Sequence, residues 1–303
     1  MKHPQPAHVA SPLLGIGLMS VAMLTVPGVD GFAKALSADH SPLFISWARY
    51  AVASLIVLPL AAFSHGATMF PTRRRVPQLL RTLFLVSSMT LYFMAIARTP
   101  LASAMSAFFV GPIIAVLIAV FWLREHLTRR KAMSLMLGFA GALVIARPGS
   151  GFDPGILLAL GAGVCFGCYL VATRMTALSA SPLQTLAFQS LVGTLMMTPQ
   201  AIATWSWPQP TEIWMFGALG LISVFSHGLS ISAFRHAGAT TLAPLVYLEL
   251  VSAAAIGYFA FAETPDVGTM IGAACIVLAG LILIERRSRR VTPAADPPST
   301  RAP

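Results

Sequence analysis

Long apolar runs alternate with short polar connections along almost the whole chain. A helix that crosses about 30 Å of hydrocarbon needs roughly 20 apolar residues, because each residue adds about 1.5 Å. Ten segments meet this requirement. They lie near residues 13–36, 43–63, 79–98, 101–122, 132–147, 154–173, 182–204, 212–234, 239–261 and 267–284. The pattern predicts ten membrane-spanning helices, joined by connections too short to hold a soluble domain.

The composition supports this interpretation. The 303 residues are 56% hydrophobic and only 10% charged, with a mean hydropathy of +0.78. Soluble domains carry roughly 25% charged residues. A chain this poor in charge cannot cover a soluble surface, so we expect an all-α integral membrane protein in contact with the lipid bilayer. The first apolar run is longer than the apolar core of a signal peptide and is expected to remain as a helix.

The basic residues predict how the chain is oriented. If the N-terminus is cytoplasmic, sixteen of the twenty Lys and Arg residues fall on the cytoplasmic side, Arg81 among them. The positive-inside rule then places both termini in the cytoplasm. We expect a multi-pass protein of a bacterial inner membrane. The net charge of +10 arises from these short clusters, so no nucleic-acid partner is expected. We expect residues 288–303 to form a disordered cytoplasmic tail.

The second half of the chain repeats features of the first at offsets of 138–140 residues. The pairs are Lys34 with Arg174, Ser41–Pro42 with Ser181–Pro182, residues 95–102 with 233–240, Glu125 with Glu263, and Gly141 with Gly280. Each unit, 1–150 and 151–287, contains five predicted spans. Because five is odd, the two units must cross the membrane in opposite directions. Inverted repeats are typical of transporters that work by alternating access.

A basic residue ending the first helix of each half and a glutamate after the fourth resemble the drug/metabolite transporter superfamily, specifically its EamA-type members. The resemblance covers about residues 13–285. It implies a ten-helix bundle with a central cavity and transport of a small-molecule substrate, and the aromatic amino acid exporters look most similar. Export of amino acids, aromatic ones favoured, is therefore the leading prediction. Import or export of another metabolite or an organic cation is the alternative. Monomers or weak homodimers are expected.

Several motifs are missing from the sequence. It has no GxxxxGK[ST] phosphate loop and neither HExxH nor GxSxG, so we expect that the driving force for transport, if there is one, is an ion gradient or exchange. Cys165 and Cys168 form a CxxC without a second pair, which favours packing over metal binding. No cofactor or metal is expected. An intramembrane enzyme or a channel remains a less favoured alternative.

Ionisable residues within spans are costly and therefore mark candidate sites. Glu249, in the ninth span, is predicted to bind a substrate ammonium or carry a proton, or else to be a protonated packing residue. Asp30 and Lys34 are four residues apart and are predicted to form a structural pair. Arg49 could either reach the outer interface or hold a substrate carboxylate.

Polar and aromatic residues supply the other candidates. His227 and Ser230 share one helix face, which indicates either a solvated cavity wall or interhelical hydrogen bonds. A pocket that stacks a ring or a cation would use aromatic side chains, with lipid contact or packing as the alternative. The remaining predicted substrate-binding residues are Ser88, Tyr92, Tyr169 and Tyr247. The predicted hinges, where the helix is interrupted, are Pro27, Gly28, Pro112 and Pro244.

Overall fold

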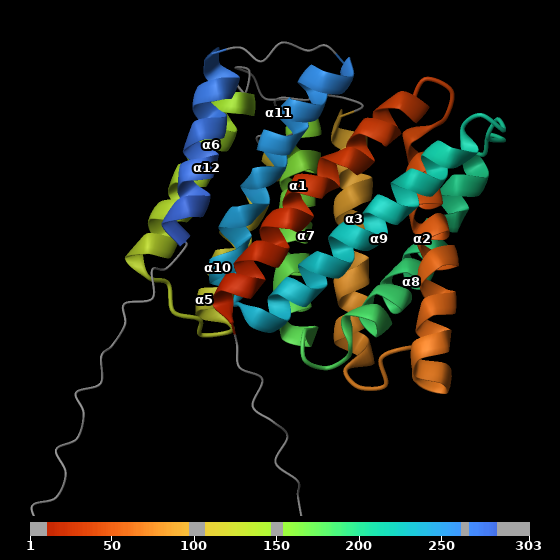
Figure 1. Ribbon diagram of the computed structural model, residues 1–303, viewed down its shortest axis with the longest axis horizontal. Helices are drawn as coiled ribbons and strands as arrows, with labels where there is room; N and C mark the ends of the chain where they lie inside the picture. Colours follow the sequence, from red (N-terminus) through yellow and green to blue (C-terminus); the bar gives the residue numbers. More distant parts are fainter. Residues whose placement is uncertain (1–10, 97–106, 147–153, 262–266, 284–303) are drawn as a thin grey trace, which may run out of the picture.

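The computed structural model describes residues 11–96, 107–146, 154–261 and 267–283, and every regular element in these ranges is helical (Figure 1). The first half contains α1 (Pro12–Leu36), α2 (Pro42–His65), the short 3₁₀ helix η1 (Gly66–Thr68), α3 (Arg75–Ile96), α5 (Gly111–Phe121) and α6 (Arg129–Ala146). The second half contains α7 (Pro154–Thr176), α8 (Pro182–Ala203), α9 (Ile213–His236), α10 (Ala239–Leu242), the 3₁₀ helix η2 (Ala243–Tyr247), α11 (Leu248–Phe261) and α12 (Val267–Leu283). In lipid every backbone polar group must find a partner within the protein, so apolar runs fold as helices.

The helices agree with the predicted spans, with two differences. The ninth span is not one continuous helix, because α10, η2 and α11 follow one another. The described part of the fourth span contains α5, which is 11 residues long. Among the described residues, five helical segments are long and apolar enough to cross a membrane by themselves. They are Pro12–Ala33, Pro42–Thr68, Pro154–Thr176, Ile213–His236 and Ala239–Ile256.

The matching pairs Ser41–Pro42 and Ser181–Pro182 begin equivalent helices. In each, the serine hydroxyl accepts a hydrogen bond from a backbone N–H of the first turn, and proline occupies the first helical position. Proline suits this position because its missing N–H would have no partner inside the helix. The repeated dipeptide therefore sets the start of α2 and of α8.

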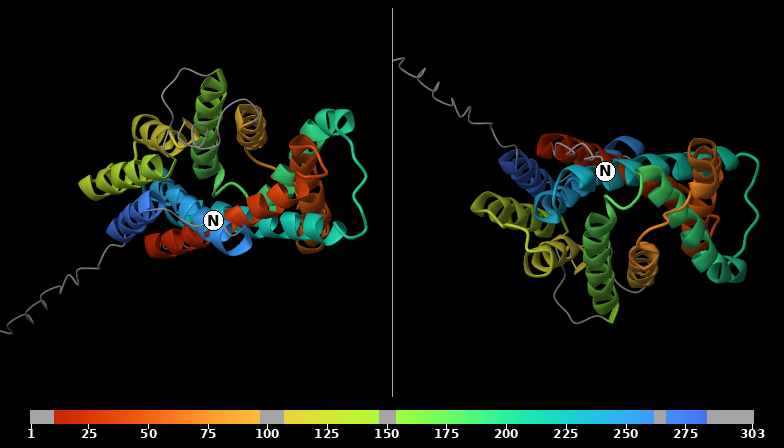
Figure 2. Two further views of the ribbon diagram at one scale, coloured as in Figure 1. Left: turned by 90° about the horizontal axis from the view of Figure 1, so that it is seen from above. Right: turned by 90° about the horizontal axis from the view of Figure 1, so that it is seen from below.

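The helix contacts follow the repeat. α1 packs along α9, and their counterparts α7 and α3 pack along one another. α2 contacts α8, and α6 contacts α12, so these two pairs join equivalent helices of the two halves. α1 rises from the lower end of Figure 1 whereas α7 descends towards it, as inverted halves require. Seen along the helices, α3 and α7 lie on one side of the molecule and α1 and α9 on the other (Figure 2).

Two glycines allow helices to approach closely where the halves meet. A Cβ on Gly163 of α7 would lie 2.5 Å from the carbonyl oxygen of Phe108, and one on Gly141 of α6 would lie 2.7 Å from that of Gly272. Any larger side chain would push these helices apart. Small residues serve this purpose in membrane bundles, where close packing replaces the hydrophobic effect.

Candidate functional site

Ionisable side chains from both halves come together inside the bundle. Asp30 of α1, Arg49 of α2 and Glu249 of α11 lie close enough for their charges to interact. The Tyr92 hydroxyl of α3 interacts with both carboxyl groups. We call Asp30, Arg49, Tyr92 and Glu249 the upper polar cluster, because α1 ends and α2 begins at the upper end of Figure 1. The cluster joins three of the predicted substrate-binding residues.

Arg49 is buried rather than extended to the membrane surface. Its side chain is 7% exposed, and it lies seven residues into α2, about 10 Å from the helix start. The guanidinium lies 5.1 Å from the centre of the Tyr50 ring, and Nη2 is 3.0 Å from the Met89 sulfur. Nε has no hydrogen-bond partner among the described residues. The burial of Arg49 does not fit the alternative in which its side chain reaches the outer interface, and its binding of an anionic group stays a prediction.

The two carboxyl groups differ from Arg49 in accessibility. Asp30 is exposed, and Glu249 and Tyr92 are half-buried. A carboxyl group inside a membrane span faces the bundle interior or water rather than lipid. The predicted pairing of Asp30 with Lys34 falls outside the described side chains, since that of Lys34 is not described. The described neighbour with opposite charge is Arg49.

A second polar group lies deeper in the bundle. Arg81 lies six residues after the start of α3. Its guanidinium is 5.7 Å from the centre of the Tyr169 ring of α7. The Tyr169 hydroxyl is 3.5 Å from His227 Nδ1 of α9. Tyr50 interacts electrostatically with both arginines. We call Tyr50, Arg81, Tyr169 and His227 the lower polar cluster.

Arg81 corrects the charge count that predicted the orientation. The hydrophobic pattern places it at the edge of a span, among the cytoplasmic basic residues. In the structure its side chain is 0% exposed. It is therefore a buried charge rather than a surface one, and fifteen basic residues remain on the predicted cytoplasmic side. Lys and Arg still predominate on the predicted cytoplasmic side, so the predicted orientation does not change.

Aromatic rings connect the two clusters. The Tyr92 ring centre lies 5.0 Å from that of Phe108, Phe108 lies 5.2 Å from Phe166, and Phe166 lies 5.9 Å from Tyr169. These four rings come from α3, the segment before α5, and α7. Phe108 and Phe166 are half-buried. Such a row can stack against a flat ring of a ligand.

The other predicted substrate-binding residues lie in helix contacts. The Ser88 hydroxyl donates to the Ala162 carbonyl of α7 at 2.8 Å, and Ser230 contacts the Met19 sulfur at 3.6 Å. The Tyr247 hydroxyl donates to the Phe109 carbonyl at 3.2 Å, and its side chain is 0% exposed. These groups already have protein partners. Their described contacts fit the packing alternative.

The predicted hinges mark real irregularities in only some cases. Pro244 lies in η2, where the α-helix gives way to a 3₁₀ helix. Pro112 lies in the first turn of α5, directly after two turn residues. Pro27 and Gly28 lie within α1, which continues through them as an α-helix. That the helices bend at these positions during transport stays a prediction.

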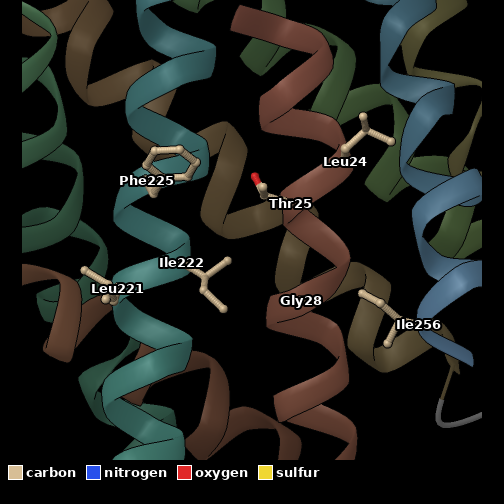
Figure 3. Close-up of a pocket in the computed structure, with 7 residues that line it drawn as sticks. All are labelled: Leu24, Thr25, Gly28, Leu221, Ile222, Phe225 and Ile256. Carbon is tan, nitrogen blue, oxygen red and sulfur yellow. The ribbon is translucent and has the colours of Figure 1, made fainter. Parts of the chain in front are cut away.

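A pocket of about 490 Å³ opens beside Gly28, between α1, α9 and α11 (Figure 3). Its other lining residues are Leu24, Thr25, Leu221, Ile222, Phe225 and Ile256. The Thr25 hydroxyl donates to carbonyls of its own helix. The lining is almost wholly apolar, so this pocket suits a hydrocarbon group rather than a charged ligand. It includes no residue of the two polar clusters.

At the lower end of Figure 1 an ion pair joins the two halves. Glu125, after α5, accepts hydrogen bonds from the backbone N–H groups of Ala239 and Thr240 at 3.1 and 2.9 Å. Arg174, at the end of α7, donates to the same carboxylate at 3.3 Å and to the Phe234 carbonyl at 2.8 Å. The repeat paired Glu125 with Glu263 and Arg174 with Lys34, but it did not predict this contact. Among the described residues, no group of three or more His, Cys, Asp and Glu side chains could hold a metal ion.

The comparisons agree with the architecture. The sequence matches the EamA-like transporter family over residues 13–147 and again over 153–285. A protein of known crystal structure, 20% identical in sequence, has the same fold, with a TM-score of 0.77 over 89% of this chain and 96% of its own. The family match covers most of both halves.

Three relatives differ in what they carry. An S-adenosylmethionine uptake transporter of Rickettsia felis is 28% identical over 273 residues, 90% of this chain and 92% of the relative. The pseudopaline exporter CntI of Pseudomonas aeruginosa is 27% identical over 89% of this chain and 95% of its own, and a riboflavin transporter of Vibrio cholerae is 24% identical over 92% and 96%. The chain therefore belongs to the EamA-like transporter family, within the drug/metabolite transporter superfamily, and is a multi-pass membrane transporter of small metabolites rather than an enzyme.

Proposed function

We propose that the protein exports amino acids, aromatic ones in particular, by alternating access. The observation that carries this proposal is that Arg49 lies within electrostatic range of both Glu249 and Asp30 in the upper polar cluster. An amino acid carries a carboxylate and an ammonium group on the same carbon atom. A guanidinium binds the first through paired N–H donors, and a carboxylate binds the second.

Each residue has a defined role in this proposal. The free Nε of Arg49 faces the substrate carboxylate, and Glu249, assisted by Asp30, faces the ammonium group. Tyr92 and Phe108 offer ring faces for an aromatic side group. Because Arg49 belongs to the first half and Glu249 to the second, the substrate would join the halves. Alternating access requires such a shared site.

The orientation is also proposed from charge. Arg73, Arg74, Arg124 and Arg129 are exposed, and all lie at the end where α1 begins. The positive-inside rule assigns that end to the cytoplasm. Both termini would then be cytoplasmic, and the upper polar cluster would lie nearer the outer face of the bacterial inner membrane.

A second candidate is uptake of S-adenosylmethionine. Four relatives from Rickettsia species carry that description, at 27–28% identity. S-adenosylmethionine is an amino acid with an added sulfonium cation and an adenine ring. Two carboxyl groups, Asp30 and Glu249, near Arg49 would suit its second positive charge, and the aromatic row would suit adenine.

A counterflow screen of the purified protein in liposomes separates the candidates. Vesicles loaded with one unlabelled solute accumulate the labelled solute only if a carrier exchanges the two. Phenylalanine, tryptophan, S-adenosylmethionine, a polyamine and riboflavin form the panel. Counterflow of aromatic amino acids alone supports the first proposal, and counterflow of S-adenosylmethionine alone supports the second. Counterflow of riboflavin or polyamine without either zwitterion contradicts both.

A further inference from the structure

Several buried polar atoms around the lower polar cluster have no hydrogen-bond partner among the described residues. They are Arg81 Nε and Nη1, the Tyr50 hydroxyl, Gln78 Oε1 and Gln189 Oε1. All four side chains are at most 3% exposed. Buried polar groups in proteins nearly always have partners, and each one left without a partner costs about 1–3 kcal/mol. So many in one place indicate a site built for something other than packing.

The charge at this place is also uncompensated. The described groups that interact electrostatically with Arg81 are the neutral phenols of Tyr50 and Tyr169 and the imidazole of His227, and none of them carries a negative charge. Asp30 and Glu249 interact with Arg49 and Tyr92 instead. A buried guanidinium without a counter-ion is strongly destabilising, by several kcal/mol. Within the described part of the chain, no carboxylate forms an ion pair with Arg81.

We propose that Arg81, together with the Tyr50 hydroxyl, forms a second anion-binding site that accepts a single carboxylate or an anion of similar size. Within the described residues, Nη2 is the one nitrogen of the Arg81 guanidinium that has a hydrogen-bond partner, at 3.3 Å from the Thr185 carbonyl oxygen. Two guanidinium nitrogens therefore remain to donate. The guanidinium lies over the Tyr169 ring, 5.7 Å from its centre, where a cation–π interaction stabilises the charge.

The site rests on the proposed function in one respect: its natural ligand would be the substrate carboxylate. Arg49 lies about 10 Å from the start of α2 and Arg81 about 9 Å from the start of α3, and these helices start at opposite ends of the bundle. Tyr50, Tyr169 and His227 each interact with both arginines. The carboxylate can thus pass from Arg49 to Arg81 while the carrier changes the side to which it is open.

The test uses the full-length protein in nanodiscs and two probes, sodium acetate and sodium chloride, each balanced with sodium isethionate at constant ionic strength. Tryptophan fluorescence reports the melting temperature. Anion binding raises that temperature saturably, because a ligand that binds only the folded state stabilises it. We expect saturation in the wild type and in the control Arg75→Gln, which removes an exposed arginine from the same helix. Arg81→Gln should weaken the apparent affinity at least tenfold.

Two further variants keep the test decisive if Arg81→Gln does not fold. Arg81→Lys keeps the charge but loses the planar fork, and Tyr50→Phe keeps the ring but loses the hydroxyl; each should weaken acetate binding severalfold. Saturation with acetate alone identifies the substrate carboxylate as the ligand, and equal saturation with chloride identifies a free inorganic anion. No saturable effect in the wild type, or an effect unchanged in every variant, overturns the proposal. Anion binding without amino acid counterflow would instead refute only the proposed function.

Discussion

Arg174 and Glu125 form an ion pair between the two halves, with Arg174 Nε 3.3 Å from Glu125 Oε1. The same carboxylate accepts hydrogen bonds from the first residues of α10, so it holds the end of α7 against the start of the ninth span. The pair is half-buried, with the glutamate side chain 15% exposed. It therefore links the halves at the end of the bundle opposite the upper polar cluster.

Glu125→Gln should loosen this end. Glutamine keeps one acceptor but loses the charge, so we expect folding stability to fall by about 1 kcal/mol. The test uses a background in which the native cysteines are replaced and a single cysteine is placed at buried Ala177. In this background, Glu125→Gln should raise the rate at which a thiol reagent labels that cysteine severalfold. Arg74→Gln is the matched control, because Arg74 also contacts α7 at this end, through the Met175 carbonyl, without reaching Glu125. Equal labelling rates in all three proteins would show that the ion pair does not hold this end closed.

Glu249→Gln should change transport or its dependence on pH without loss of folded protein. Glutamine has the size of glutamate but can neither pair with an ammonium group nor release a proton. The measurement is the counterflow rate of the substrate between pH 5 and 8, with size-exclusion chromatography to confirm the fold. Transport that is identical to the wild type across that range would remove Glu249 from the site.

Gly193→Ala should disturb substrate binding through Tyr50. A Cβ on Gly193 would lie 2.7 Å from Cδ1 of the Tyr50 ring, which in turn lies against the Arg49 guanidinium. We expect the KM for transport to rise about threefold to tenfold as the ring and the guanidinium shift. Gly217→Ala is the control, since its Cβ would have no neighbour within 4 Å. If Gly193→Ala leaves the KM unchanged, the position of the Tyr50 ring does not affect substrate binding.

The connection that precedes α9 should contribute pH-dependent stability. Glu212 Oε2 lies 3.0 Å from His40 Nε2 and accepts a hydrogen bond from Gln209 N–H at 2.7 Å. These bonds hold the pKa of Glu212 below its ordinary value of 4.5. A lowered pKa stabilises the fold above the ordinary value and loses that effect as the pH falls through the folded-state pKa. The melting temperature of Glu212→Gln should therefore fall below that of the wild type near pH 6, and the difference should shrink as the pH falls below 4.5. A difference that grows on acidification would contradict this.

The sequence was sufficient to predict the fold because lipid leaves the backbone few alternatives. The apolar runs, the repeat with its Ser41–Pro42 and Ser181–Pro182 helix starts, and the family resemblance all indicated the same architecture, and the family match confirms it. The division of the ninth span was only signalled by Pro244. A single proline does not reveal whether the helix bends, breaks or tightens into a 3₁₀ turn.

The site was predicted only in part, because sequence places a residue along a helix but not against its neighbours across the bundle. Arg49, Tyr92 and Glu249 were identified as ionisable or aromatic residues within spans. Arg81 was missed because its position near a span boundary resembles a surface charge, although the structure buries it completely. The Ser88 hydroxyl donates to a carbonyl of α7, a contact across the bundle that the sequence could not indicate. Tyr50, directly after Arg49, could have been found from that adjacency.

The most direct test of the central claim compares counterflow of three versions of one substrate: the intact amino acid, its methyl ester without a carboxylate, and its deaminated acid without an ammonium group. The wild type and Arg75→Gln should exchange only the intact amino acid. Arg49→Gln should lose its discrimination against the ester, and Glu249→Gln its discrimination against the deaminated acid, because each variant lacks the group that recognises the missing charge. If both variants keep the selectivity of the wild type, Arg49 and Glu249 do not bind the two ends of one substrate, and the account is wrong.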